Sequence, residues 1–262
     1  MGPGRNSDVQ SHVRRLWRHH GTTVPTPRRG PRQQLDLDDV IEAAIAIADT
    51  EGLAAVSTRA VAAKFGKSAM ALYPYVGSKE NLISLMQDLA CALPAWSNPT
   101  ASLADALETW ALKLFHVYSA HPWLTELRWS QASQGPNQQA WLERLLAILD
   151  AWHVPVSTRA PVVTALYATI RATAQTATAY QRIDGHGIGA WRASAATTAL
   201  LIPDFAERYP QTVRLQVSSD HKWQQAPRVA LRRAVKIVAR GVDPTTGVVR
   251  RSRTNAGPSS PS

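Results

Sequence analysis

From residue 35 to about residue 242, apolar residues recur three or four positions apart, and short breakers of Gly, Ser or Pro interrupt the pattern. This spacing places the apolar side chains on one face of a helix, whereas a half-buried strand needs them at every second position. The only alternating stretch, residues 212–217, is a short candidate strand. We therefore expect an all-α fold.

Composition divides the chain into four parts. Residues 1–34 are rich in Pro, Gly and Arg and hold too few apolar residues to pack, so we expect a flexible basic arm. Residues 35–92 have the pattern of a small N-terminal helical domain, and residues 93–242 that of a larger helical domain. Residues 243–262 are expected to be a disordered tail.

The net charge of +10 is concentrated at the two ends of the chain. Residues 1–35 hold seven Arg and one acid, and residues 222–262 hold nine Lys or Arg and one acid. These ends carry +6 and +8, so residues 36–221 carry −4. Basic ends of this kind suggest a nucleic acid or an acidic surface as partner, and a solvated tail explains them equally well.

Several kinds of protein are disfavoured. Cys91 is the only cysteine, which excludes an internal disulfide and thiolate zinc clusters. No stretch approaches the ~18 apolar residues of a membrane span, and no signal peptide is evident, so we expect a cytoplasmic protein without a membrane partner. The histidines lack metal-ligand spacing, and the Gly-rich residues 184–189 follow no strand. We expect no enzymatic activity, no metal and no cofactor.

The small domain has the layout of a helix-turn-helix unit. Asp36 can cap a first helix, a shorter helix is expected at residues 58–65, and Gly66 provides the turn. A third helix is expected at residues 69–76, and Ser78 can cap a fourth. In a helix-turn-helix unit the third helix enters the major groove of DNA while the second crosses the backbone.

Residues 40–86 resemble the DNA-binding domain of tetracycline-repressor-like (TetR family) transcription regulators. The run reads VIEAAIAIADTEGLAAVSTRAVAAKFGKSAMALYPYVGSKENLISLM, and the shared elements are AA…AD.EG, S.R.VA…G, ALY and SKE.L. The resemblance implies an all-α homodimer that represses transcription at a palindromic double-stranded DNA operator and releases it when a small-molecule effector binds. Residues 93–242 match the family only in being helical and of suitable length.

The matched positions carry groups that suit DNA. The expected phosphate contacts are Thr58, Arg59, Tyr73, Tyr75 and Lys79. The positions expected to begin or line the groove-facing helix are Lys67, Ser68, Ala69, Met70 and Tyr73. Helix packing for the two tyrosines and a solvated charge for Lys79 are the alternatives. Pro74 is expected to end the recognition helix early.

The arm offers a second mode of contact. Arg28, Arg29 and Arg32 lie on a Pro- and Gly-rich segment just before the first helix. Arg side chains on an extended segment suit a narrow, A·T-rich minor groove. A disordered tail without defined contacts is the equally weighted alternative.

The larger domain is rich in tryptophan. The candidate effector-binding residues are Trp110, His116, Trp123, Trp129, Trp141, Tyr167, Arg171 and Gln175. They combine apolar surface with a few polar groups, as ligand cavities do. The alternative is that the aromatic residues form the core and that Arg171 forms an ion pair with a neighbour.

The last predicted helix, residues 228–240, carries two stripes. The apolar stripe consists of Leu231, Ala234, Val235 and Val238, and the basic stripe of Arg228, Arg232, Lys236 and Arg240. The resemblance implies that this helix and the long helix at residues 158–183 form a four-helix dimer bundle, which would explain the apolar stripe. A solvated face is favoured for the basic stripe. An architectural, ligand-independent DNA-binding protein is the alternative to a repressor.

Overall fold

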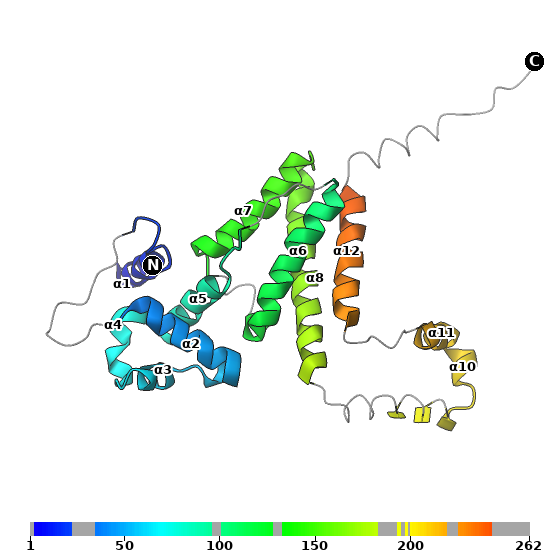
Figure 1. The fold of residues 1–262 in the computed structure, drawn as a ribbon, viewed down its shortest axis with the longest axis horizontal. Coiled ribbons are helices and arrows are strands. Elements are labelled where there is room, and N and C mark those ends of the chain that lie inside the picture. The colour runs from blue at the N-terminus through cyan, green and yellow to red at the C-terminus, as the bar shows by residue number, and fades with distance from the viewer. Residues whose placement is uncertain are drawn as a thin grey trace, which may run out of the picture.

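The computed structural model describes residues 3–22, 35–95, 101–127, 133–182, 193–194, 197–198, 200–218 and 225–242 (Figure 1). Within these ranges every regular element is a helix, so the predicted all-α class is confirmed. A group of short N-terminal helices precedes a larger helical domain, also as predicted. No helix among the described residues is long and apolar enough to span a membrane.

Three of the short helices, α2, α3 and α5, begin where the sequence predicts. The short helices are α2 (Leu37–Glu51), η1 (Leu53–Ala55), α3 (Thr58–Lys64), η2 (Ala69–Ala71), α4 (Tyr73–Val76) and α5 (Lys79–Ala90). The side chains of Asp36, Ser57 and Ser78 each accept a hydrogen bond from a first-turn N–H, at 2.7, 3.0 and 3.1 Å. These bonds satisfy N–H groups that have no partner inside the helix and so fix where α2, α3 and α5 begin.

Residues 69–76, which we call the recognition segment, do not form the single third helix that was predicted. A 3₁₀ turn, η2, comes first, and α4 follows as a separate turn with Pro74 as its second residue. Pro74 was expected to end the helix, but it begins the next turn instead. A proline is tolerated there because the first N–H groups of a helix need no internal acceptor.

Residues 1–34 are not a flexible arm throughout, which corrects the prediction. Residues Pro3–Leu16 form α1, which packs beside α5. Leu16 is 4 % exposed, and Arg18 donates to the carboxylate of Asp38 on α2. The composition of residues 1–34 does not indicate this helix, because α1 is held by one buried leucine and a few polar contacts rather than by a broad apolar face.

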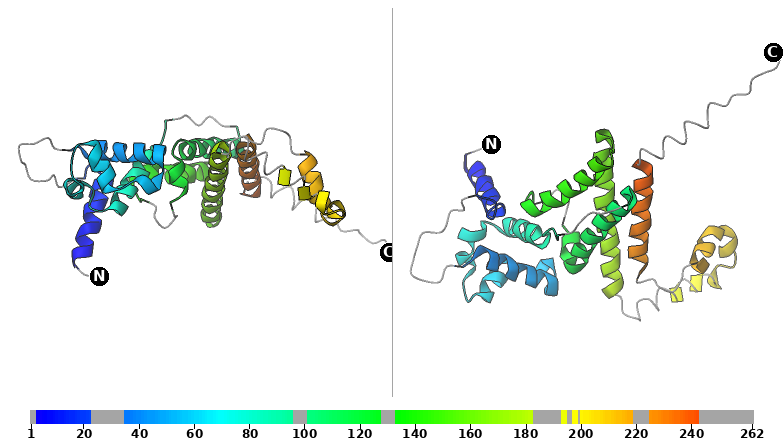
Figure 2. Two further views of the ribbon diagram at one scale, coloured as in Figure 1. Left: turned by 90° about the horizontal axis from the view of Figure 1, so that it is seen from below. Right: turned by 45° about the horizontal axis from the view of Figure 1, so that its top comes forward.

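The larger domain is built around three long helices. Its elements are α6 (Leu103–Ala120), η3 (Pro122–Thr125), α7 (Pro136–Ala151), α8 (Val156–Arg182), α10 (Phe205–Arg208), α11 (Pro210–Ser218) and α12 (Ala226–Val242). Helices α6, α8 and α12 pack against one another, and α10 and α11 stand apart from them (Figures 1 and 2). The candidate strand at residues 212–217 is part of α11, because a helix satisfies its backbone groups locally and a strand needs a partner.

The apolar stripe of α12 packs inside its own chain. Of its four members, Leu231 and Val235 are completely buried, and Ala234 and Val238 are half-buried. The predicted dimer bundle is therefore not needed to explain this stripe. The apolar residues that α12 exposes are others, Val229 (45 % exposed) and Ile237 (70 %).

Candidate nucleic-acid interface and ligand groove

The start of α3 presents groups that can hold a phosphate. Ser57 is the N-cap, Thr58 opens the helix, and the exposed Arg59 follows. The first turn of α3 contains no acidic residue. The positive end of the helix dipole and a guanidinium thus reach solvent together, an arrangement that favours anions.

The recognition segment exposes a short row of side chains around one buried anchor. Leu72 has no exposed surface, whereas Met70 is 73 % exposed and Tyr73 43 % exposed. An exposed methionine and tyrosine next to a buried leucine are unusual for a segment that contacts only solvent. The anchor fixes the segment while the two large side chains project outward, as contact with base edges or phosphates requires.

The other predicted DNA-contact residues differ in how far they are exposed to solvent. Ser68 is exposed, Lys67 and Ala69 are half-buried, and Lys79 is exposed in the first turn of α5. Tyr75 is half-buried and packs against the core, which is the alternative the sequence left open. Arg28, Arg29 and Arg32 lie outside the described residues.

Helix α1 adds a contact that the sequence did not suggest. Arg15 donates from Nη2 to the backbone carbonyl of Pro74, 3.3 Å away in α4. His12 lies 3.0 Å from the Oγ of Ser84 on α5, and burial, reinforced by the nearby Arg15, lowers the pKa of His12. Helix α1 therefore contacts the recognition segment through the hydrogen bond between Arg15 and the carbonyl of Pro74.

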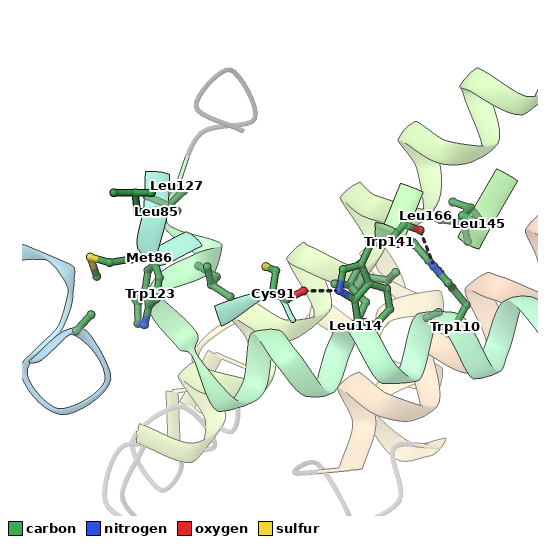
Figure 3. Close-up of a cluster of buried hydrophobic side chains, with 14 of the residues drawn as sticks. Leu85, Met86, Cys91, Trp110, Leu114, Trp123, Leu127, Trp141, Leu145 and Leu166 are labelled. Carbon is green, nitrogen blue, oxygen red and sulfur yellow. Dashed lines mark hydrogen bonds between the residues drawn. The ribbon is translucent and has the colours of Figure 1, made fainter. Parts of the chain in front are cut away.

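The predicted effector tryptophans lie in the core of the larger domain. Trp110, Trp123 and Trp141 are 0 %, 2 % and 1 % exposed. The indole N–H of Trp110 donates to the carbonyl of Trp141 at 3.1 Å, and that of Trp141 donates to the carbonyl of Cys91 at 2.8 Å (Figure 3). These two indoles thus have their hydrogen-bond partners within the protein. Trp129 lies outside the described residues.

The predicted residues of α8 also have partners within the chain. Arg171 Nε and Gln175 Nε2 both donate to the carbonyl of Thr125 at the end of η3, each at 2.9 Å. Tyr167 contacts Trp110 edge to face, with ring centroids 5.3 Å apart. Arg171 and Gln175 therefore tie η3 to α8, and the ion pair weighed as an alternative for Arg171 is replaced by a bond to a carbonyl.

A groove of about 440 Å³ lies between α6, the segment after α5 and the start of α12. Its lining consists of Ala92, Pro94, Leu112, Lys113, Phe115, His116, Val117 and Arg228. Of the seven predicted effector residues that the structure describes, only His116 is in this lining. The volume is in the range of sites for small organic ligands.

Two carboxylates, the exposed Asp49 and the buried Asp88, connect the domains, and the sequence alone did not indicate either contact. Asp49 on α2 accepts from the indole of Trp123 at 2.8 Å. Asp88 on α5 is 4 % exposed and accepts from the backbone N–H of Gln138, at 3.1 Å, in the first turn of α7. A Cβ on Gly135 would lie 2.3 Å from Asp88, so this close approach requires glycine. An acid in the last turn of a helix opposes the helix dipole, and that was the available signal for Asp88.

The family described as "Bacterial regulatory proteins, tetR family" matches residues 40–86. The "HTH-type transcriptional repressor DrrR1" of Streptomyces coeruleorubidus is 37% identical over 149 residues, 55% of this chain and 53% of that protein. An "HTH-type transcriptional regulator" of Saccharopolyspora erythraea is 28% identical over 130 residues, 48% of this chain and 54% of that protein. The chain thus spans about half the length of these curated relatives.

Solved structures share the fold. Apo ActR from Streptomyces coelicolor has a TM-score of 0.66 at 21% identity, with 83% of this chain and 99% of ActR covered. ActR in complex with actinorhodin has a TM-score of 0.66 at 20% identity, with 80% and 99% covered. At this identity the likeness establishes the fold alone.

Proposed function

We propose that this chain is a member of the TetR family of bacterial regulatory proteins and acts as a transcriptional repressor, which binds a palindromic operator as a homodimer and leaves it when a small-molecule effector binds. The observation that carries the proposal is the exposed pair Met70 and Tyr73, projecting from a segment anchored by the buried Leu72. The proposed target, bacterial DNA, also implies that the protein acts in the cytoplasm.

Charge supports DNA as the partner of this surface. Arg59 and Lys79 are both exposed in the first turns of their helices, on either side of the recognition segment in sequence. Two cations that flank a groove-reading segment suit phosphates on either side of a major groove. Arg28, Arg29 and Arg32 would add contacts in the neighbouring minor groove.

The homodimer is supported by the outward faces of α8 and α12. Ala165, Ala168 and Ala172 of α8 are exposed at helical spacing, and α12 exposes Ile237. Small residues on one helix and a large apolar residue on its neighbour suit close packing against a second copy. Ile237→Glu is expected to convert a dimer into a monomer, as measured by sedimentation, and to weaken operator binding strongly.

The effector is supported by the groove and by a structural neighbour. ActR has been solved in complex with actinorhodin, so a protein with this fold binds a small organic molecule. The groove beside α6 has a suitable volume and lies next to the end of α5, the last helix of the DNA-binding domain.

Footprinting of the purified protein on genomic DNA tests the proposal. A repressor protects a short palindrome with a fixed half-site spacing of about one helical turn or a multiple of it. Compounds are then screened for the release of that DNA. Protection without sequence preference would favour the architectural DNA-binding alternative and overturn the proposal. A ligand that quenches tryptophan fluorescence but leaves operator affinity unchanged is not the effector.

A further inference from the structure

We infer that the groove between α6 and α12 binds an organic anion, a molecule with an apolar ring body and a carboxylate or similar acidic group. The inference rests on the proposed function, because it names the class of effector. The carrying observation is that an apolar lining and three basic side chains converge on one groove, namely Lys113, His116 and Arg228.

The apolar part of the lining suits a flat or compact hydrophobic body. Leu112, Phe115 and Val117 of α6 are half-buried, and Pro94 is exposed opposite the helix. Apolar side chains that remain half-open at the mouth of a groove gain free energy when an apolar ligand covers them. A small inorganic anion would leave this surface uncovered.

Arg228 differs from its neighbours Arg232 and Lys236 on α12 in having no ion pair among the residues that the structure describes. Glu108 pairs with two members of the basic stripe, Arg232 at 3.0 Å and Lys236 at 3.4 Å. Arg228 lies one turn before Arg232 on the same helix, and no carboxylate among the described residues forms an ion pair with it. None of the eight lining residues is acidic. The groove therefore offers a guanidinium to a ligand anion.

The position of Arg228 is also unfavourable for its own helix. It lies in the first turn of α12, a turn without any acidic residue. A cation at this end of a helix faces the positive end of the helix dipole. A bound anion would offset the charge of Arg228 and the positive end of the helix dipole. Helix stability alone gives no reason for a basic residue at this position.

The groove is placed where an occupant can affect the DNA-binding domain. Ala92 and Pro94 follow directly on α5, and the carbonyl of Cys91 at the end of α5 is held by the indole of Trp141 at 2.8 Å. A ligand that packs against Ala92 and Pro94 thus touches the connection between the two domains. Ligand binding that shifts this segment changes the position of α5 relative to α6.

Calorimetric titration of the full-length protein with three probes tests the inference. The probes are 2-naphthoate, its neutral analogue 2-naphthamide, and acetate, which has the charge without the ring body. We expect 2-naphthoate to bind at least about tenfold more tightly than either of the others, as one charge-assisted contact and one buried ring system predict. Arg228→Gln is expected to weaken 2-naphthoate about tenfold and to leave 2-naphthamide unchanged.

Arg233→Gln is the matched control, because Arg233 is exposed on the same helix outside the groove lining. It is expected to leave all three affinities unchanged, and thermal melting checks that both variants are folded. Equal binding of 2-naphthoate and 2-naphthamide, no saturable binding of 2-naphthoate up to its solubility limit, or an equal loss in Arg233→Gln would overturn the inference. Operator binding by the wild type and by Arg228→Gln is measured without any probe. If the wild type does not bind an operator in that measurement, the proposed function is overturned, whereas the inference that the groove binds an organic anion is not.

Discussion

The indole N–H of Trp123 donates to Oδ1 of Asp49 at 2.8 Å, and this bond joins η3 of the larger domain to α2 of the DNA-binding domain. His121 Nδ1 lies 2.9 Å from the same oxygen. Two residues further along η3 than Trp123, the carbonyl of Thr125 accepts a hydrogen bond from Nε of Arg171 on α8. A continuous set of polar contacts thus runs from the long helix of the larger domain to the first helix of the DNA-binding domain.

Replacement of Asp49 by Ala is expected to destabilise the protein by about 1–3 kcal/mol, because the buried Trp123 indole loses its acceptor. Asp49→Asn keeps an oxygen acceptor and is expected to cost less. Unfolding in denaturant measures both. Glu42→Ala, at an exposed position of the same helix, serves as the control and is expected to have little effect. An equal loss in Asp49→Ala and Glu42→Ala would contradict the assigned bond.

Asp88 is expected to make stability depend on pH in an unusual direction. Burial raises the pKa of Asp88 above its ordinary value, although N–H groups of Gln138 and Asn137 oppose the shift. The folded protein then binds a proton more tightly than the unfolded chain does. At neutral pH the ionised, buried Asp88 lowers the free energy of unfolding. This cost is relieved as the pH falls through the folded-state pKa and the carboxylate becomes protonated.

Asp88→Asn removes this titration. We expect the free energy of unfolding of the wild type, relative to that of Asp88→Asn, to increase as the pH is lowered from neutral toward the ordinary carboxyl range. Denaturant titrations of both proteins over that range measure the difference, in which the other titrating groups cancel. A difference that stays constant or changes in the opposite direction would show that hydrogen bonding, rather than burial, dominates at Asp88.

The parts of the fold that depend on local sequence were predictable. The caps at Asp36 and Ser78 and the start of a helix at Thr58 follow from short-range sequence, and the structure contains each of them. The recognition segment was harder, because the family pattern indicates one helix and Pro74 divides it locally.

The polar contacts between domains were not predictable, for a physical reason. The bond between Asp49 and Trp123 joins residues 74 positions apart, and that between Asp88 and Gln138 joins residues 50 apart. Sequence spacing reveals which face of a helix is apolar, but it does not reveal which helices meet. For the same reason, Trp110 and Trp141 were equally suited to a ligand cavity and to the core until their mutual contact was seen.

Trp110 and Trp141 are expected to act as one structural unit. Their rings meet edge to face with centroids 5.9 Å apart, in addition to the hydrogen bond between them. Each single replacement by Ala is expected to cost about 3–5 kcal/mol. The double variant is expected to cost less than the sum by about 0.5–3 kcal/mol, since the second change removes a contact already lost. Strictly additive losses would show that the rings are not coupled.

Lys79 is expected to contact a DNA phosphate directly. The slope of log K against log salt concentration for operator binding should therefore become shallower by about 0.9 per protomer in Lys79→Gln. Arg233→Gln removes the same charge from α12, in the other domain, and should leave the slope unchanged. If both variants change the slope equally, Lys79 acts through net charge and not through a phosphate contact.

Arg15 is expected to position the recognition segment without touching DNA. Its Nη2 donates to the carbonyl of Pro74, so loss of the guanidinium frees α4 on the side facing α1. Arg15→Gln should lower affinity for the operator severalfold while the salt slope and the affinity for unrelated DNA stay at wild-type values. Fluorescence anisotropy with operator and unrelated duplexes at several salt concentrations measures all three quantities. Arg14→Gln is the control, since Arg14 is exposed on the same helix. A shallower slope in Arg15→Gln would instead show a phosphate contact and contradict the positioning role.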